Sequence, residues 1–114
     1  MDKYTSDTFQ TEATGSWQTI EPGVRRQIMG YDDRLMLVKV AFEAGVRGAL
    51  HAHPHSQASV VLSGVFEATV DGETRMLRAG EGFYAAPNRM HGVSCLEAGT
   101  IMDTFSPARE DFLK

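Results

Sequence analysis

Turn-forming residues interrupt this sequence at short and regular intervals, and that spacing constrains the fold more than any other feature. After Trp17, glycine, proline, asparagine and aspartate divide the chain into segments that suit strands. We expect about nine short strands with turns roughly every eight to twelve residues, which is typical of a sandwich or barrel. Because no long helical segment separates these strands, a parallel α/β architecture is disfavoured.

Alternation of apolar residues supports this all-β interpretation. The segment 35–42 is apolar at every second position, so we expect one of its faces to contact the core. That face carries Met36, Val38, Val40 and Phe42. Asp71-Gly72 predicts a two-residue hairpin, because a type I′ turn needs a positive φ at both positions. The expected strands cover residues 24–30, 35–42, 47–53, 57–62, 65–70, 73–78, 83–86, 90–96 and 100–105.

The chain is expected to form one domain that follows a polar arm. A length of 114 residues suits one domain, which buries roughly two-thirds of its unfolded surface. Residues 1–16 are polar and lack periodicity, so they are assigned to the arm and residues 17–114 to the domain. Ser106-Pro107 is typical of a helix N-cap followed by proline, which predicts a short helical segment over 108–113.

The composition disfavours several classes of partner. The net charge is −4 and the basic residues are scattered, so no basic stripe is available for nucleic acid. No apolar run approaches the roughly 20 residues that a membrane helix needs, and the N-terminus does not resemble a secretory signal. The single cysteine, Cys95, excludes an internal disulfide and is expected to be a small buried hydrophobe. These features favour a cytoplasmic protein that binds neither nucleic acid nor membrane.

Histidines supply the clearest chemical pattern. His51 and His53 are two positions apart on an expected strand, so their side chains share a face. Gln57 opens the next expected strand, and His91 follows a turn that can bring it to the same place in a barrel. We therefore predict a metal site made of these four residues, because imidazoles that converge in this way are typical metal ligands. His55 is either an ordinary surface or core residue or a contact around the ligands or the substrate.

Two motifs resemble those of the cupin superfamily. They are Gly45-x5-His51-x-His53-x3-Gln57-x6-Gly64 and, more loosely, Gly80-x6-Pro87-x3-His91. The resemblance implies a single-domain cupin-type β-barrel (jelly roll) that holds one divalent transition metal ion, such as Ni, Zn, Fe or Mn. Position 57 usually carries Glu in this family. A neutral Gln57 leaves the charge of the metal uncompensated, so the site should attract an anionic substrate oxygen more strongly.

Both ends of the domain resemble the pectin-degradation family KdgF more specifically. The matching runs are His51-Ala52-His53-Pro54-His55-Ser56-Gln57 and Asp103-Thr104-Phe105-Ser106-Pro107-Ala108-Arg109-Glu110-Asp111-Phe112. The resemblance implies that the chain opens the ring of 4,5-unsaturated monouronates from pectin or alginate, giving 4-deoxy-5-keto uronates. By motif position, Asp103, Phe105 and Arg109 would face this small acidic sugar.

The resemblance suggests a role for each of these residues. Asp103 is our candidate acid–base group, and Arg109 is a candidate catalytic residue that would bind the substrate carboxylate as a fork. Phe105 would form an apolar wall, and His55 would contact the substrate. Met90 is a further candidate for the cavity lining, although packing in the core is the more common role of such a methionine.

The sequence is also compatible with two other functions, and it raises the question of whether the chain self-associates. A three-histidine site with open positions also suits an Fe(II)-dependent small-molecule dioxygenase of the cupin type. A non-catalytic sugar- or metal-binding cupin module is the second alternative. One face of the strand at 57–62 is apolar, at Ala58, Val60 and Leu62, and requires cover from a second sheet or another subunit. The cupin resemblance favours a homodimer.

Overall fold

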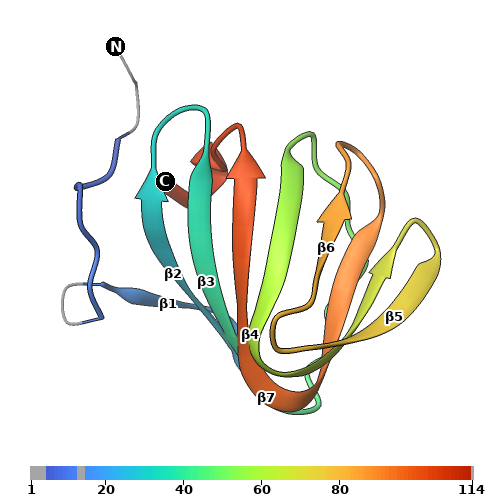
Figure 1. Ribbon diagram of the computed structural model, residues 1–114. Coiled ribbons are helices and arrows are strands. Elements are labelled where there is room, and N and C mark those ends of the chain that lie inside the picture. The colour runs from blue at the N-terminus through green and yellow to red at the C-terminus, as the bar shows by residue number, and fades with distance from the viewer. Residues whose placement is uncertain (1–4, 13–14, 114) are drawn as a thin grey trace.

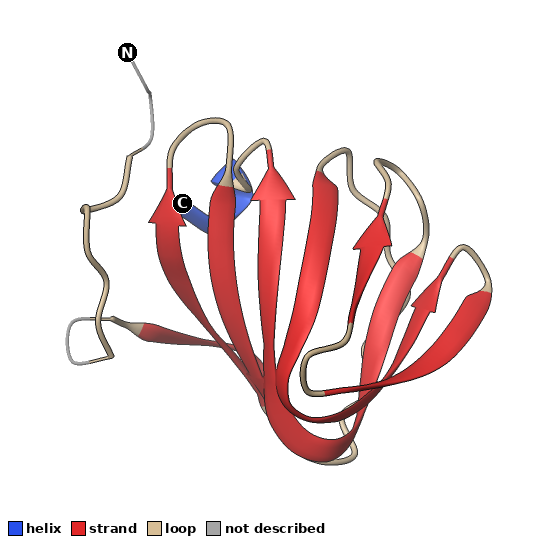
Figure 2. Cartoon of the chain, in the orientation of Figure 1, coloured by secondary structure: helices blue, strands red, loops and turns tan. Residues whose placement is uncertain are grey.

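The computed structural model describes residues 5–12 and 15–113, which form strands almost throughout (Figure 1 and Figure 2). The elements are β1 (Trp17–Glu21), β2 (Val24–Tyr31), β3 (Met36–Phe42), β4 (Ser56–Val70), β5 (Glu73–Arg78), β6 (Gly82–Ala85), β7 (His91–Ser106) and the 3-10 turn η1 (Glu110–Leu113). All pairings between these strands are antiparallel. The all-β prediction is therefore confirmed.

The strands form one sheet in the order β1-β2-β3-β7-β4-β5, and β6 pairs with the first part of β4. Within the described residues, β1 pairs only with β2 and β5 only with β4, so the sheet is strongly curved but does not close into a barrel. The expectation of a closed barrel is corrected in this respect. The segment 47–53 is also not a regular strand. It lies along β7 through two isolated bridges, Arg47 to Ser94 and His51 to His91.

Two long bent strands replace four of the expected short ones. β4 continues through Ser63-Gly64 and β7 continues through Gly99, where the expected strands ended (Figure 1). The β4–β7 register shifts between Val61 and Phe66, as it does at β-bulges, which bend a strand without ending it. A Cβ on Gly64, which has a φ of +83°, would lie 2.6 Å from the Glu97 carbonyl oxygen. Glycine at this bend therefore permits both the conformation and the close approach of the backbones.

The concave face of the sheet carries the core. Directly paired residues share a face, so Val40 of β3, Ile101 of β7 and Val61 of β4 form a buried row across three strands. Met36 and Val38 of β3 are also fully buried, as the alternation predicts. Burial of each such side chain contributes roughly 1.5–3 kcal/mol relative to exposure. This packing fixes the inner face on which the site is built.

The two ends of the chain differ from the expectations in detail. Ser106 belongs to β7, and its hydroxyl donates to the Arg34 carbonyl at 2.7 Å instead of capping a helix. The Ser106–Pro107 peptide bond is cis, and the helical segment is reduced to η1. Of the arm, residues 1–4 and 13–14 lie outside the described residues, and 5–12 form neither strand nor helix. No described helix has the length and apolar composition needed to cross a bilayer.

Candidate metal centre

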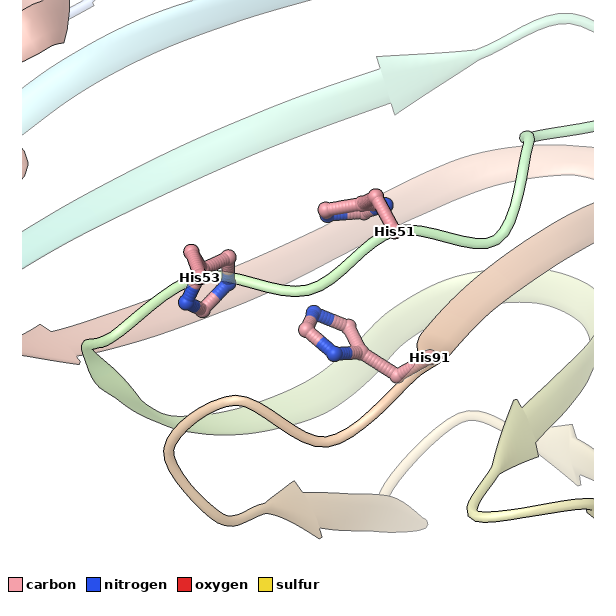
Figure 3. Close-up of side chains that lie close together, drawn as sticks. All are labelled: His51, His53 and His91. Carbon is pink, nitrogen blue, oxygen red and sulfur yellow. The ribbon is translucent and has the colours of Figure 1, made fainter.

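Three histidines from two segments meet on the concave face (Figure 3). His51 and His53 lie in the segment between β3 and β4, and His91 is the first residue of β7. The backbones of His51 and His91 exchange two hydrogen bonds of 2.9 Å, which hold the two segments together at this point. One ligand atom of each ring lies within 4.8 Å of the others. The three histidines that the sequence groups together are thus positioned to bind one metal ion.

Backbone carbonyls orient all three rings. Nδ1 of His51, His53 and His91 lies 3.2, 3.1 and 2.9 Å from the carbonyl oxygens of Ala49, His55 and Arg89. A carbonyl oxygen only accepts hydrogen bonds, so each Nδ1 carries the proton and donates it. In a neutral ring this leaves the Nε2 lone pair unprotonated, which is the form that binds a metal.

Gln57 completes the cluster from β4. Its Oε1 lies 2.9 Å from Nε2 of His53 and 3.1 Å from Nε2 of His91. Its Nε2 donates to Ser59 Oγ at 3.0 Å and to Asp103 Oδ1 at 3.3 Å. Because an amide donates only through nitrogen, these two acceptors turn the Gln57 oxygen toward the histidines.

The donor set fits a metal ion. The Gln57 oxygen and the unprotonated ring nitrogens are all electron-pair donors. They lie close together, but none of them carries a hydrogen that could form a hydrogen bond between them. Burial, assisted by the charge of Arg109, lowers the pKa of His53 and of His91, which keeps both rings neutral. Such a convergence of lone pairs is stabilised by a cation, and nitrogen with one amide oxygen suits a divalent transition metal.

Asp103 lies beside this cluster, on the inner face of β7. Ser59 Oγ donates to its Oδ1 at 2.6 Å, and the Gln57 amide donates to the same oxygen. Burial raises the pKa of Asp103 to about 6, although the hydrogen bonds from Ser59 and Gln57 act in the opposite direction. Both hydrogen bonds end on Oδ1, so Oδ2 is left to another partner.

A cavity of about 310 Å³ connects the cluster with the rest of the concave face, a size in the range of small-molecule sites. Apolar residues of β2, β3 and β7 form much of its wall, and polar and charged side chains also line it. Its lining includes His51, Gln57, His91, Asp103, Phe105, Arg109, Arg26, Phe112, Val24, Val38, Val40 and Ile101.

Arg109 is placed at the cavity but is already engaged. Its Nε and Nη2 donate to the two carboxylate oxygens of Asp111 at 3.1 and 3.0 Å. Its guanidinium carbon lies 5.1 Å from the ring centroid of Phe105 and 4.3 Å from that of Phe112. The two N–H groups that were expected to bind a substrate carboxylate therefore bind Asp111. Only the remaining N–H groups of Arg109 are left for a substrate. Phe105 is buried and lines the cavity, as expected for an apolar wall.

The other two predicted contacts lie elsewhere. Met90 is 49% exposed, so the expectation that it packs in the core is wrong, and it is not among the residues that line the cavity. His55 is half-buried, and its ring meets that of His53 edge-on at 5.4 Å. It is not among the cavity-lining residues, and its backbone carbonyl is the group that lies 3.1 Å from Nδ1 of His53.

Arg26, Ser59 and Phe112 were not predicted as site residues. Ser59 shares the Gln57 face of β4, so strand alternation alone would have found it. Arg26 lies between Val24 and Ile28 on the inner face of β2, and a single charge on an apolar strand face was the available signal. Phe112 is carried by η1, where no periodicity indicates which way a side chain points.

Comparison with known proteins agrees with the site. Residues 38–103 match the family described as Cupin domain, Cupin_2. The pectin degradation protein KdgF of Dickeya dadantii (strain 3937) is 43% identical over 99 residues, which are 85% of this chain and 90% of the relative. The crystal structure of an RmlC-like cupin from Shewanella frigidimarina NCIMB 400 is 42% identical with a TM-score of 0.92, covering 95% of this chain and 97% of that one. The structure of KdgF from Halomonas sp. is 38% identical with a TM-score of 0.89, covering 94% and 99%. The chain therefore belongs to the cupin superfamily and, within it, to the KdgF family.

Proposed function

We propose that this protein is an enzyme of pectin or alginate degradation that opens the ring of 4,5-unsaturated monouronates. One observation carries the proposal: a carboxylate, Asp103, lies directly beside the histidine cluster in a cavity that also contains arginines. The relatives named KdgF support the choice of substrate.

The proposed reaction moves one proton and involves no oxidation. The substrate is a cyclic hemiacetal whose ring oxygen is attached to the C4–C5 alkene. Loss of the proton on the anomeric hydroxyl forms the C1 aldehyde and breaks the bond between C1 and the ring oxygen. The electron pair passes through the resulting C5 enolate to C4, which takes up a proton. The product is the linear 4-deoxy-5-keto uronate.

The cluster of His51, His53, His91 and Gln57 would hold one divalent transition metal ion, such as Ni, Zn, Fe or Mn. When bound, such an ion supplies a Lewis acid for a substrate oxygen that gains negative charge. None of the four side chains is acidic, so they add no negative charge that would repel an acidic sugar.

Asp103 is the proposed proton-transfer group. Ser59 and Gln57 fix one of its oxygens, so the other is held in a defined direction at the cavity. A positioned carboxylate of this kind can take the proton from the anomeric hydroxyl and return one to C4. Phe105 keeps the adjacent wall apolar, and Arg109 places a positive charge near the substrate carboxylate.

The decisive experiment uses an unsaturated uronate made with a polysaccharide lyase. Metal-loaded protein should accelerate the loss of the alkene absorbance over the spontaneous rate in a protein-free control, and product analysis should give the 5-keto uronate. No acceleration would refute the proposal. Oxygen consumption coupled to turnover would instead indicate a metal-dependent dioxygenase, and binding of sugar without turnover would indicate a binding module.

Two further proposals concern the setting of the enzyme. We propose a cytoplasmic location, as the composition and the single cysteine favour. We also propose a homodimer that covers the convex face of β4, because Val60 and Leu62 are 36% and 46% exposed there. Tyr84 of β6 pairs with Ala58 and extends this patch. Contiguous apolar patches on a protein surface usually mark contacts.

A further inference from the structure

We propose that Arg26 of β2 is a substrate-binding residue that, together with Arg109, takes the carboxylate of an acidic sugar in the cavity. This inference rests on the proposed function for the identity of the sugar. It assigns anion binding to the side of the cavity that β2 lines, two strands away from β7 in the sheet order.

The register of the sheet places Arg26 on the concave face. Arg26 pairs with Val40, which pairs with Ile101 of β7, and both partners line the same cavity. Its neighbours on the same face of β2 are apolar, whereas Arg25 points to the opposite face. The guanidinium is therefore the polar group that this strand contributes to the cavity wall.

Among the described residues, the contacts of Arg26 hold it without a direct ion pair, although the charge of Asp111 acts on it from nearby. Its Nε donates to Gln18 Oε1 at 2.9 Å, which leaves Nη1 and Nη2 for other acceptors. Its guanidinium carbon lies 3.7 Å from the ring centroid of Phe112, a cation–π contact that fixes its position. It makes no ion pair with any residue in the described ranges 5–12 and 15–113.

Two guanidiniums thus gather on one aromatic ring. Arg109 lies 4.3 Å from the centroid of the same Phe112 ring, but its fork is already bound to Asp111. Burial and the charge of Arg109 lower the pKa of Arg26, and the nearby Asp111 carboxylate offsets only part of this cost. An anion that binds between the two arginines relieves the remaining cost. Arg26 is the better ligand of the pair, because both of its terminal amino groups are available for a two-point contact.

A carboxylate is the anion that suits this arrangement. The cavity of about 310 Å³ holds one sugar ring rather than a polymer. A monouronate can reach the histidine cluster with its hydroxyl and ring oxygens while its single carboxylate points to the arginines. Arg26 would then determine specificity for acidic over neutral sugars.

The experiment compares Arg26→Gln with the matched control Arg25→Gln. Arg25 is exposed on the opposite face of the same strand, with its guanidinium 4.9 Å from the Trp17 ring centroid. Binding of saturated galacturonate and of neutral galactose to metal-loaded protein is measured by calorimetry. We expect Arg26→Gln to weaken galacturonate binding about tenfold and galactose binding less than twofold, as loss of a charged two-point contact predicts. Arg25→Gln should change neither by more than twofold, and equal galacturonate binding in the two variants would overturn the proposal.

Kinetics with the unsaturated uronate give a second readout. Arg26→Gln should raise KM about tenfold with kcat within about twofold, because a carboxylate contact kept through the reaction contributes uniform binding. Arg26→Lys keeps the charge but loses the fork, so an affinity for galacturonate between those of wild type and Arg26→Gln is expected. If Arg26→Gln does not fold, Arg26→Lys decides, and wild-type affinity in that variant would refute the two-point contact.

The outcomes also separate this inference from the proposed function. If wild-type protein fails to open the unsaturated ring but binds galacturonate in an Arg26-dependent way, the proposed reaction is wrong and the anion site stands. If ring opening is observed but Arg26→Gln behaves like Arg25→Gln, the proposed reaction stands and the anion site is wrong. Metal content and melting temperature, measured for each variant, exclude loss of the cluster as the cause.

Discussion

The two faces of β4 have opposite character over the same few residues. On the concave face, Gln57 and Ser59 are polar and buried. On the convex face, Val60 and Leu62 are apolar and exposed. This inverts the usual arrangement of a half-buried strand, in which apolar residues face the core and polar residues face water.

This inverted pattern gives the two faces of β4 different roles: the concave face belongs to the candidate site, and the convex face is a candidate contact surface. A buried amide and hydroxyl are costly unless they are hydrogen-bonded, and here each has partners in the cluster or at Asp103. An exposed apolar face is equally unfavourable unless something covers it. The proposed chemistry within one subunit would account for the concave face, and the proposed dimer would account for the convex face.

The strongest test of the concave face removes a histidine. His91→Ala should lose the metal and, with it, all measurable ring opening. The variant keeps only two histidine nitrogens and one amide oxygen as donors, and such a set should bind a metal ion weakly. His55→Ala, which removes a histidine outside the cluster, should keep its metal. Elemental analysis of both purified variants gives the answer. Full metal occupancy in His91→Ala would show that the cluster is not the binding site.

The next largest effect is expected at Asp103. Asp103→Ala should keep the metal but reduce ring opening at least about a hundredfold, in the range typical of a lost acid–base group. Glu67→Ala is the control, since it removes an exposed carboxylate of β4 that is not among the residues lining the cavity. Turnover by Asp103→Ala at the wild-type rate, measured by alkene absorbance, would remove this residue from the mechanism.

Particular residues show what the sequence could and could not predict. The grouping of the cluster was predictable, because histidines two apart on an extended segment share a face and the motif spacing added Gln57 and His91. The bends of β4 and β7 could not be predicted, because Ser63-Gly64 is compatible with either a turn or a β-bulge. Which of the two forms depends on how β4 pairs with β7. Arg26 was also missed, since its position depends on a contact with Phe112, which lies far along the chain.

A charge change at position 57 tests whether the neutral amide matters. Gln57→Glu should retain the metal and bind it more tightly, because a carboxylate is the stronger ligand. It should also raise KM for the acidic sugar about tenfold, because the negative charge of the new carboxylate reduces the attraction of the site for an anion. The same charge repels the Asp103 carboxylate, to which the Gln57 amide donates in the wild type. Metal affinity and KM are measured on the same preparations. Unchanged KM would mean that the ligand charge does not set substrate affinity.

The smallest effect on catalysis is expected from the convex face. Leu62→Asp places a charge on the exposed apolar patch and should convert a dimer into a monomer, because a desolvated carboxylate at an interface is strongly unfavourable. Light scattering coupled to size exclusion measures the mass, and Glu67→Asp, at an exposed position further along β4, serves as the control. Ring opening per subunit should stay within about twofold, because the residues of the cavity that we assign to the reaction all come from one chain. A monomeric wild type would leave the convex face unexplained by self-association, whereas a dimeric but inactive Leu62→Asp would show that the two faces of β4 are coupled.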